Sequence, residues 1–399
     1  MVATTYTHLM DGEVFESNNR SDEKQLILPD TEIDNKYRRG EMRIITEQGR
    51  INLHAIVTTL DSTQGGKSKY ILTPAYQRRK RWDNRKKSLL IESFIINVPI
   101  PPIYLYEVEY AVYEVMDGLQ RLTTIYDFYK GKFALEGLEY WQELNGKTYH
   151  ELPQNVKAGI DRRYLSSIVL LAETSQKPED AEFLKQIVFE RLNNGGVRLT
   201  AQETRNALYN GKFNKLCLKL SEYENFRKMW HFPLISADEK ELLKNDAYRE
   251  MQDVELVLRF FAYRHIDKLN FPISKFLDNF LKQANSYPDY TLLKLEKLFI
   301  QTVDTIYEIL GKHAFVLPKQ KKIPTKIIYD TIMQAFANNI EYHDTFIKNK
   351  KSIKEDLYKG ISSFNDKDDK PLFDGRLNNK KHIIRRIEYF HDYLQSHIS

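Results

Sequence analysis

The spacing of apolar residues changes near Pro178, and this change constrains the fold more than any other feature. Before Pro178, short β-like apolar runs alternate with amphipathic helical patterns, whereas after it the apolar residues recur three and four positions apart. The first pattern predicts a small mixed sheet with helices and the second predicts a domain made of helices. The expected fold class is therefore α+β, with a flexible arm at 1–25, an α/β domain at 26–175 and a helical domain at 176–399.

The predicted elements of the α/β domain alternate along the chain. We expect strands at 69–76, 98–109, 110–116 and 164–173, and helices at 83–97 and 119–131. Asp83 is placed to cap the first of these helices, and Gly131 is placed to end the second. The strands at 98–109 and 110–116 are close enough in sequence to pair as a hairpin.

The helical domain is predicted from six long amphipathic patterns. They cover 179–194, 201–213, 245–266, 292–311, 324–339 and 380–394. The charged segment 364–381 between the last two patterns is typical of a solvated loop.

Composition excludes several classes of protein and indicates a cytoplasmic location. The chain has 60 Lys and Arg against 55 Asp and Glu, a net charge of +5 that suits a nucleic-acid partner without requiring one. Cys217 is the single cysteine of the chain, which rules out an internal disulfide and a thiolate zinc cluster. The polar, acidic first residues differ from a signal peptide, and no apolar run approaches the roughly 18 residues of a membrane span.

A polar corner interrupts the sequence YEVMDGLQRLTTIYDFYK, Tyr113 to Lys130, where a predicted strand passes directly into a predicted helix. One interpretation is structural. With Asp117 as the N-cap, Gln120 falls at the third helical position and the two side chains form a capping box. Gly118 then only eases the turn.

The second interpretation of this corner is a phosphate site. A helix start offers free N–H groups and a partial positive charge, which attract phosphate. Gly118 would let the backbone approach closely, and Arg121 would add a bidentate contact. The carboxylate of Asp117 fits such a site only with Mg²⁺ between it and the phosphates. The residues of the corner alone leave both interpretations open.

A basic cluster, TPAYQRRKRWDNRKK at 73–87, follows the first predicted strand. It is either a solvated entry to a basic helix or an anion-binding surface. In the second case Gln77, Arg78 and Trp82 lie on the turn as candidate nucleotide contacts. The candidate contacts to a nucleic-acid backbone are Arg79, Lys80, Arg81, Arg85 and Lys86.

A third stretch, FERLNNGGVRLTAQETRNALYNGKF, covers residues 189–213. Its Asn-Asn-Gly-Gly run is suited to ending a helix, since Asn and Gly accept positive φ. Thr200 and Glu203 fit a capping box for the next helix, which gives Glu203 a structural role. Arg205 and Asn206 remain as functional candidates.

These three stretches together resemble a known family. They are similar to the N-terminal domain family of GmrSD-type restriction enzymes, domain-of-unknown-function family 262. The similarity rests on four segments: P-x-Y-Q-R-x-x-x-W at 74–82, LLIESFIINVPIPPIYL after it, DGLQRLTT at 117–124 and FERLNNGGVRLTAQETRNALY at 189–209. The similarity runs in the family's order over roughly residues 45–215. It implies a ParB/sulfiredoxin-like domain followed by helices, nucleoside-triphosphate binding and hydrolysis, and a link to restriction of modified DNA in anti-phage defence.

The resemblance assigns roles to individual residues. The Asp-Gly-x-Gln-Arg corner is tied to nucleotide hydrolysis, which makes Asp117, Gln120 and Arg121 the expected catalytic residues, with Asp117 on the metal. The expected nucleotide contacts are Gly118, Gln77, Arg78 and Trp82, with Asn193 and Gly195 added by the third stretch.

The sequence departs from the family pattern at two points. Leu119 replaces the first glutamine of the usual Asp-Gly-Gln-Gln-Arg, so any contact made by that amide is missing. Full-length enzymes of the family add an HNH-type nuclease domain, whereas His382, His391 and His397 here lie in or beside an amphipathic helical pattern. We therefore expect the nuclease or other effector to be a separate partner subunit.

Three functions stay under consideration. The first is an NTP-binding and NTP-hydrolysing sensor subunit that uses Mg²⁺, contacts DNA and governs an effector in type IV restriction-like defence. The second is a non-enzymatic DNA-binding adaptor in which the corner is structural. The third is a metal-dependent nuclease built on the ParB-like domain, with Asp117 as metal ligand. The sequence does not specify the nucleotide, the DNA modification or the oligomeric state.

Overall fold

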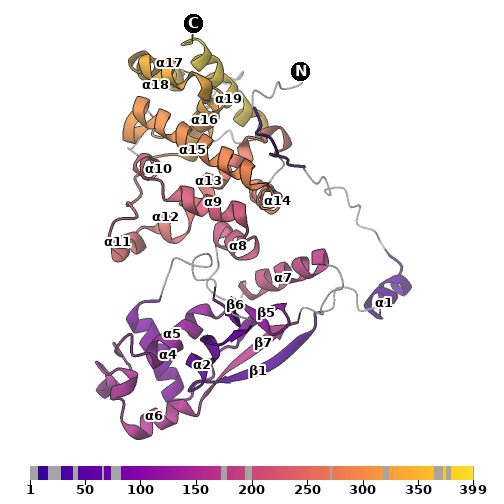
Figure 1. The fold of residues 1–399 in the computed structure, drawn as a ribbon, viewed down its shortest axis with the longest axis vertical. Helices are drawn as coiled ribbons and strands as arrows, with labels where there is room; N and C mark the ends of the chain where they lie inside the picture. Colours follow the sequence, from indigo (N-terminus) through magenta and orange to yellow (C-terminus); the bar gives the residue numbers. More distant parts are fainter. Residues whose placement is uncertain are drawn as a thin grey trace. The chain divides into compact units, whose positions relative to one another are not determined.

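The structure is a computed structural model that describes most of the chain. The described residues are 8–16, 28–38, 44–64, 67–72, 82–171, 178–193, 200–269, 272–317, 323–363, 372–373 and 379–398. The chain divides into two compact units, one of residues 24–199 and one of residues 1–23 with 200–399 (Figure 1). The α+β fold class is confirmed, since the first unit holds a small mixed sheet with helices and the second is helical.

The α/β unit is built on a five-stranded sheet with the order β1-β7-β5-β6-β4. Strand β5 pairs antiparallel with β6 and parallel with β7, β1 is antiparallel to β7, and β4 is parallel to β6. The strands are β1 Thr46–Asn52, β4 Tyr70–Ile71, β5 Ile103–Glu109, β6 Val112–Asp117 and β7 Tyr164–Leu170, with a separate two-stranded pair β2 Thr63–Gln64 and β3 Lys67–Ser68. The helices are α1 Asp30–Arg38, α2 Ile56–Leu60, α4 Asn84–Ile95, α5 Leu119–Tyr129, α6 Gln154–Asp161 and α7 Pro178–Asn193.

Local sequence signals account for the central elements of this unit. The Asp83 carboxylate accepts a hydrogen bond from the Lys86 amide at 2.8 Å, which confirms it as the N-cap of α4. The predicted hairpin is confirmed as β5 and β6. Strand β1 escapes prediction because its sequence TEQGRIN is polar and mostly exposed at the edge of the sheet.

Opposite faces of the sheet are covered by different helices. Ile103 and Leu105 of β5 point into the core that α4 and α5 share. The alternate residue Tyr106 points the other way, toward α7. There Lys185 of α7 lies 4.9 Å from the Tyr106 ring centroid and 2.5 Å from the Glu114 carboxylate of β6. Helix α7 therefore belongs to the α/β unit, and the boundary between the units follows Leu199 rather than residue 175.

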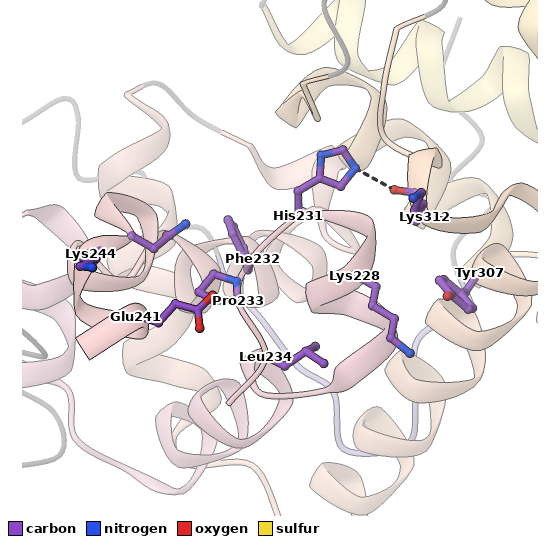
Figure 2. Close-up of a pocket in the computed structure, with 10 residues that line it drawn as sticks. Lys228, His231, Phe232, Pro233, Leu234, Glu241, Lys244, Tyr307 and Lys312 are labelled. Atoms are coloured by element: carbon purple, nitrogen blue, oxygen red, sulfur yellow. Dashed lines mark hydrogen bonds between the residues drawn. The ribbon is translucent and has the colours of Figure 1, made fainter. Parts of the chain in front are cut away.

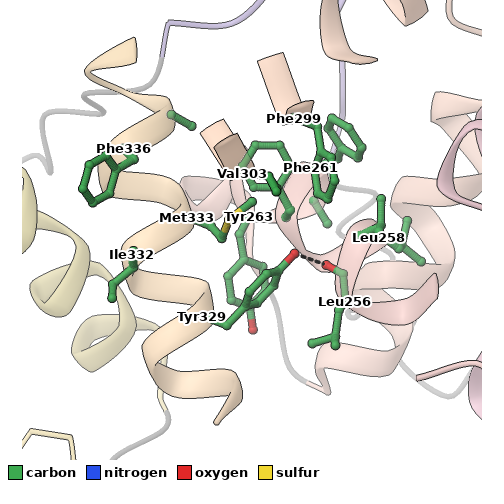
Figure 3. Packing of buried hydrophobic residues seen from close by; sticks show 14 of the residues in the cluster. Leu256, Leu258, Phe261, Tyr263, Phe299, Val303, Tyr329, Ile332, Met333 and Phe336 are labelled. Atoms are coloured by element: carbon green, nitrogen blue, oxygen red, sulfur yellow. Dashed lines mark hydrogen bonds between the residues drawn. The ribbon is translucent and has the colours of Figure 1, made fainter. Parts of the chain in front are cut away.

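The helical unit is packed around α13, Gln252–Tyr263, which is buried on nearly all sides (Figure 3). An apolar sequence around the whole helix, such as VLRFFAY, is suited to this central place. The Tyr329 hydroxyl of α16 donates to the Leu256 carbonyl at 2.8 Å, so the polar atom of a fully buried tyrosine is satisfied. The helices of this unit are α8 Ala201–Leu208, α9 Lys212–Ser221, α10 Glu224–Met229, α11 Glu239–Lys244, α12 Asp246–Arg249, α13, α14 Ile273–Ala284, α15 Asp289–Leu310, α16 Lys326–Ala337, α17 His343–Lys348, α18 Lys350–Ser363 and α19 Lys380–Gln395.

Among the described residues, no helix combines the length and apolar character needed to cross a bilayer. Helix α19 contains His382 and His391, as the helical pattern predicts. The His391 ring is buried and bonds the Asn339 carboxamide at 2.9 Å, which gives it a structural role in the helical unit.

Residues 8–16 pack against the helical unit, in contrast to the flexible arm that the sequence predicts for 1–25. Phe15 is buried between Phe276 and Phe280 of α14, with ring centroids 5.5 Å apart in each pair. The Glu13 carboxylate is fully buried and accepts from Arg264 at 2.7 and 2.8 Å. Glu13 and Arg264 are more than 250 residues apart in sequence. A local sequence pattern therefore cannot predict their contact.

The Glu13–Arg264 pair makes a testable contribution to stability. Burial raises the pKa of the Glu13 carboxyl, but hydrogen bonds from Arg264 and His265 outweigh burial and lower the pKa to about 2. Glu13→Gln leaves the buried guanidinium without its counter-charge, and we expect the free energy of unfolding to fall by about 3–5 kcal/mol at pH 7. Urea unfolding followed by circular dichroism measures this.

Acid should remove the same contribution. Because the pKa of Glu13 is lowered in the folded state, its stabilisation is present above pH about 4.5 and is lost as pH falls toward 2. The difference between wild type and Glu13→Gln should therefore shrink over that range. Glu16→Gln is the control, since Glu16 is exposed on the same segment. Equal effects of the two substitutions at pH 7 would contradict the assignment.

Candidate functional site

The corner between β6 and α5 is built around Gly118, which is the N-cap of α5 in the structure. Its φ of 91° lies in the left-handed region, and a Cβ at this position would be 2.4 Å from Ile103 Cγ2 of β5. Glycine is therefore required by both backbone and packing. The corner is a close approach between the turn and the neighbouring strand.

The carboxylate of Asp117 pairs with Arg121 instead of capping the helix. The Arg121 Nη2 atom lies 2.8 Å from Asp117 Oδ2, and Arg121 Nη1 donates to the Pro101 carbonyl. The N-cap is Gly118, so the interpretation of Asp117 and Gln120 as a capping box is wrong. The physical reason is that a guanidinium one helical turn away offers the carboxylate a charged partner.

The ion pair is only partly shielded from solvent. The side chain of Asp117 is 41% exposed and that of Arg121 is 12% exposed. Such a pair contributes about 0–1 kcal/mol to stability, because water competes for the carboxylate. The corner thus holds an acid and a guanidinium beside a helix start, and opening their pair requires little free energy.

Gln120 joins the corner to the end of the basic cluster. Its carboxamide oxygen accepts a hydrogen bond from the Trp82 amide at 3.2 Å. The Lys86 ammonium lies 4.9 Å from the centroid of the Trp82 ring. Two stretches that are nearly forty residues apart in sequence therefore meet at one place, with Trp82, Gln120 and Lys86 side by side.

The sheet explains why these stretches meet. Strands β4 and β6 are parallel, with Ile71 opposite Glu114, so both chains leave the sheet at the same edge. Leu72 and Trp82, which flank the segment 73–81, therefore both lie near the corner. The corner therefore lies at the carboxyl ends of this parallel pair.

The other predicted site residues have different outcomes. Gln77, Arg78, Arg79, Lys80, Arg81 and Gly195 lie outside the described residues. Arg85 and Lys86 are exposed in the first turn of α4, and Asn193 is the last residue of α7. Only the corner residues, Trp82, Arg85 and Lys86 can therefore be placed in one region of the α/β unit.

Arg205 and Asn206 are structural parts of the helical unit. The capping box of Thr200 and Glu203 is confirmed at the start of α8. Just over one turn into α8, Arg205 lies in the interior, where it pairs with Glu255 at 3.0 Å and Asp278 at 2.7 Å. Asn206 is buried as well and accepts a hydrogen bond from Gln202 at 3.0 Å. Neither side chain is available to a ligand.

No cluster of three or more His, Cys, Asp or Glu side chains able to hold a metal ion occurs in the described part of the chain. A structural metal or a zinc site needs a full set of protein ligands, and the described residues offer none. Mg²⁺ with a nucleotide does not need such a cluster, because that ion is bound through one or two carboxylates together with phosphates and water. Asp117 is the carboxylate that fits this second case.

Comparison with protein families identifies the domain that carries the corner. Residues 58–210 match the family described as GmrSD restriction endonuclease, N-terminal domain. The match includes the basic cluster, the corner and the third stretch as far as residue 210. Neither the curated proteins nor the solved structures contain a match to this chain, so the ParB/sulfiredoxin-like fold stays a prediction.

The close packing at Gly118 predicts a large effect of a single added methyl group. Gly118→Ala should lower the free energy of unfolding by about 1–2 kcal/mol for the positive φ and by about 1–3 kcal/mol more for the overlap with Ile103. Gly146→Ala is the matched control, because Gly146 has φ 83° and no atom within 4 Å of a built Cβ. Urea unfolding compares the two variants. Equal losses would show that the corner accommodates a side chain.

Proposed function

Because residues 58–210 form a domain of the GmrSD restriction endonuclease N-terminal family, we propose that this chain is a restriction-type defence protein that acts on DNA. We further propose that its α/β unit binds and hydrolyses a nucleoside triphosphate with Mg²⁺ at the β6–α5 corner. The observation that carries the second proposal is the partly exposed Asp117–Arg121 pair at a helix start. Acid, guanidinium and first-turn amides are together the groups that a metal-bound triphosphate requires.

The ion pair is compatible with this role on energetic grounds. Separating Asp117 from Arg121 costs about 0–1 kcal/mol for a pair of this exposure, and losing the bond to Pro101 costs about 0.5–1.5 kcal/mol more. A guanidinium bound to phosphate makes charge-assisted hydrogen bonds of about 1.5–3 kcal/mol each. The exchange of Asp117 for phosphate oxygens is therefore favourable when a triphosphate is present.

Each residue of the corner has a distinct task in this proposal. Arg121 offsets negative charge on the phosphoryl oxygens as water adds to phosphorus and the bond to the bridging oxygen breaks. Asp117, released from Arg121, would hold Mg²⁺, and that ion would supply positive charge to the phosphates. The oxygen of Gln120 is engaged by Trp82, so its amide nitrogen is the group that would orient water or the nucleotide. Gly118 leaves room for the backbone to approach.

The DNA contact is proposed for the basic cluster. Arg85 and Lys86 are exposed at the start of α4, and Arg79, Lys80 and Arg81 precede them in the sequence. Gln77, Arg78, Asn193 and Gly195 remain proposed nucleotide contacts on the basis of the resemblance alone. A separate nuclease or effector subunit is the proposed partner, and modified DNA the proposed signal.

A second candidate is favoured by one observation, the mutual satisfaction of Asp117 and Arg121. If the pair never opens, the corner is a structural turn, and the chain is a DNA-binding adaptor without nucleotide turnover. Salt-dependent DNA affinity with no hydrolysis of any nucleotide would identify this case.

Arg121→Ala separates the two candidates. Turnover of ATP and GTP, measured as phosphate release with Mg²⁺, should fall about a hundredfold or more, because one preorganised cation is removed from the developing charge. The fold should persist, since the pair is partly exposed. Arg162→Ala, an exposed arginine of the same unit, is the control and should leave turnover unchanged. Wild-type turnover by Arg121→Ala would refute the catalytic assignment.

A further inference from the structure

The loop between α5 and α6 holds two large aromatic side chains out in solvent. The Leu135 amide donates to the Lys147 carbonyl at 2.9 Å and the Gly146 amide donates to the Leu135 carbonyl at 2.7 Å, which closes this loop at its base. Its buried apolar residues are Leu135, Leu138 and Leu144. Tyr140, in contrast, is 73% exposed and Trp141 is 40% exposed. The aromatic loop, residues 135–147, therefore buries its leucines and presents the two residue types that are most enriched, with arginine, at the energetic centres of protein interfaces.

Helix α4 fixes the main chain of the aromatic loop. The buried carboxylate of Glu92 accepts hydrogen bonds from three consecutive amides, those of residues 139–141, at 3.1, 2.8 and 2.8 Å. One helical turn earlier, the Ser88 hydroxyl accepts from the Glu136 amide at 2.8 Å. The two rings therefore project from a main chain that is ordered before any partner binds, which lowers the entropic cost of binding.

The side chains around the two rings are acidic. Glu136, Glu139 and Glu143 are exposed, and none of the three has an ion-pair partner within the described part of the chain. Lys147 is the single cation of the aromatic loop, whereas the chain as a whole carries a net charge of +5. The loop is thus a local reversal of charge, which repels phosphate groups and attracts the cations of a partner.

We propose that the aromatic loop is a docking site for an arginine-rich segment of a partner protein. A guanidinium can stack on an aromatic ring and, with the same planar group, donate two hydrogen bonds to a carboxylate. Trp141 and Tyr140 supply the rings, and the neighbouring glutamates supply the carboxylates. Arginine fits this combination better than lysine, because an ammonium neither stacks nor donates in a fork.

The aromatic loop adjoins the basic cluster. The side chain of Arg85 passes over Gly137, where a Cβ would lie 3.1 Å from Arg85 Cγ. A partner bound to the loop would therefore lie next to residues proposed to contact DNA. This placement suits an effector subunit that acts on the same DNA, an identity that rests on the proposed function, whereas the docking of an arginine-rich segment does not depend on it.

Trp141 provides a direct readout of docking. In the full chain labelled with 5-fluorotryptophan, the ¹⁹F NMR signal of Trp141 is assigned by its loss in Trp141→Phe. Titration with an octa-arginine peptide should shift this signal saturably and leave that of the buried Trp230 unmoved. An octa-lysine peptide of equal charge should bind about threefold or more weakly, because stacking and forked hydrogen bonds are lost.

Fluorescence anisotropy of a labelled octa-arginine peptide tests the rings by substitution. Tyr140→Ser/Trp141→Ser should weaken binding about tenfold or more, since both stacking surfaces are removed. Tyr37→Ser/Tyr110→Ser is the matched control, because these tyrosines are 81% and 85% exposed in the same unit, and it should change the affinity less than twofold. All four positions are exposed, so the fold should persist, and circular dichroism checks this.

The glutamates are tested in the same way. Glu139→Gln/Glu143→Gln should weaken binding about fivefold or more, because two charge-assisted contacts are lost. Glu222→Gln/Glu241→Gln removes equal charge from exposed positions of the helical unit, where Glu241 lines an open hollow of about 730 Å³ (Figure 2), and should change the affinity less than twofold.

Three results would overturn the proposal. One is a Trp141 signal that does not move with octa-arginine. Another is an equal loss of affinity in the loop variants and their controls, which would show attraction to the chain as a whole. The third is a saturable shift of the Trp141 signal with a single-stranded oligothymidine in place of the peptide, which would assign the rings to nucleic acid.

Discussion

The pairing of Asp117 with Arg121 across the first turn of α5 is the interaction on which the proposed chemistry depends. It occupies the carboxylate and the guanidinium that a metal-bound triphosphate would use, so the corner is either a finished structural turn or a site whose groups hold one another until a ligand arrives. Water reaches the carboxylate, which is 41% exposed, more readily than the guanidinium, which is 12% exposed. The glycine between the two residues lets the turn approach Ile103 closely, where a Cβ would overlap the Ile103 side chain.

How far the sequence predicts the fold depends on the distance between partners. The N-cap Asp83, the β5–β6 hairpin and the capping box at Thr200 rest on neighbours in the chain, and all three are confirmed. The placement of α7 on the sheet depends on Glu114, and the packing of residues 8–16 depends on Arg264. Such contacts join segments that are far apart in sequence. They explain why the unit boundary follows Leu199 and why residues 8–16 pack against the helical unit.

The candidate site is predictable to a similar degree. The corner residues stand out because an acid, a glycine and an arginine at the end of an apolar strand are unusual, but sequence does not decide whether Asp117 prefers amides or a guanidinium. Arg205 was a functional candidate in the sequence, but in the structure it is a buried arginine with two acidic partners. The sequence alone does not distinguish such an arginine from one that contacts a ligand.

The most direct test of the proposed exchange of partners is the ¹⁵N NMR signal of the Arg121 side chain during titration with a triphosphate and Mg²⁺, assigned by its loss in Arg121→Lys. If the guanidinium leaves Asp117 for phosphate, this resonance should shift saturably, with the same midpoint as nucleotide binding. An unchanged resonance at saturating nucleotide, in a protein that still turns the nucleotide over, would show that the corner is structural and that the chemistry lies elsewhere.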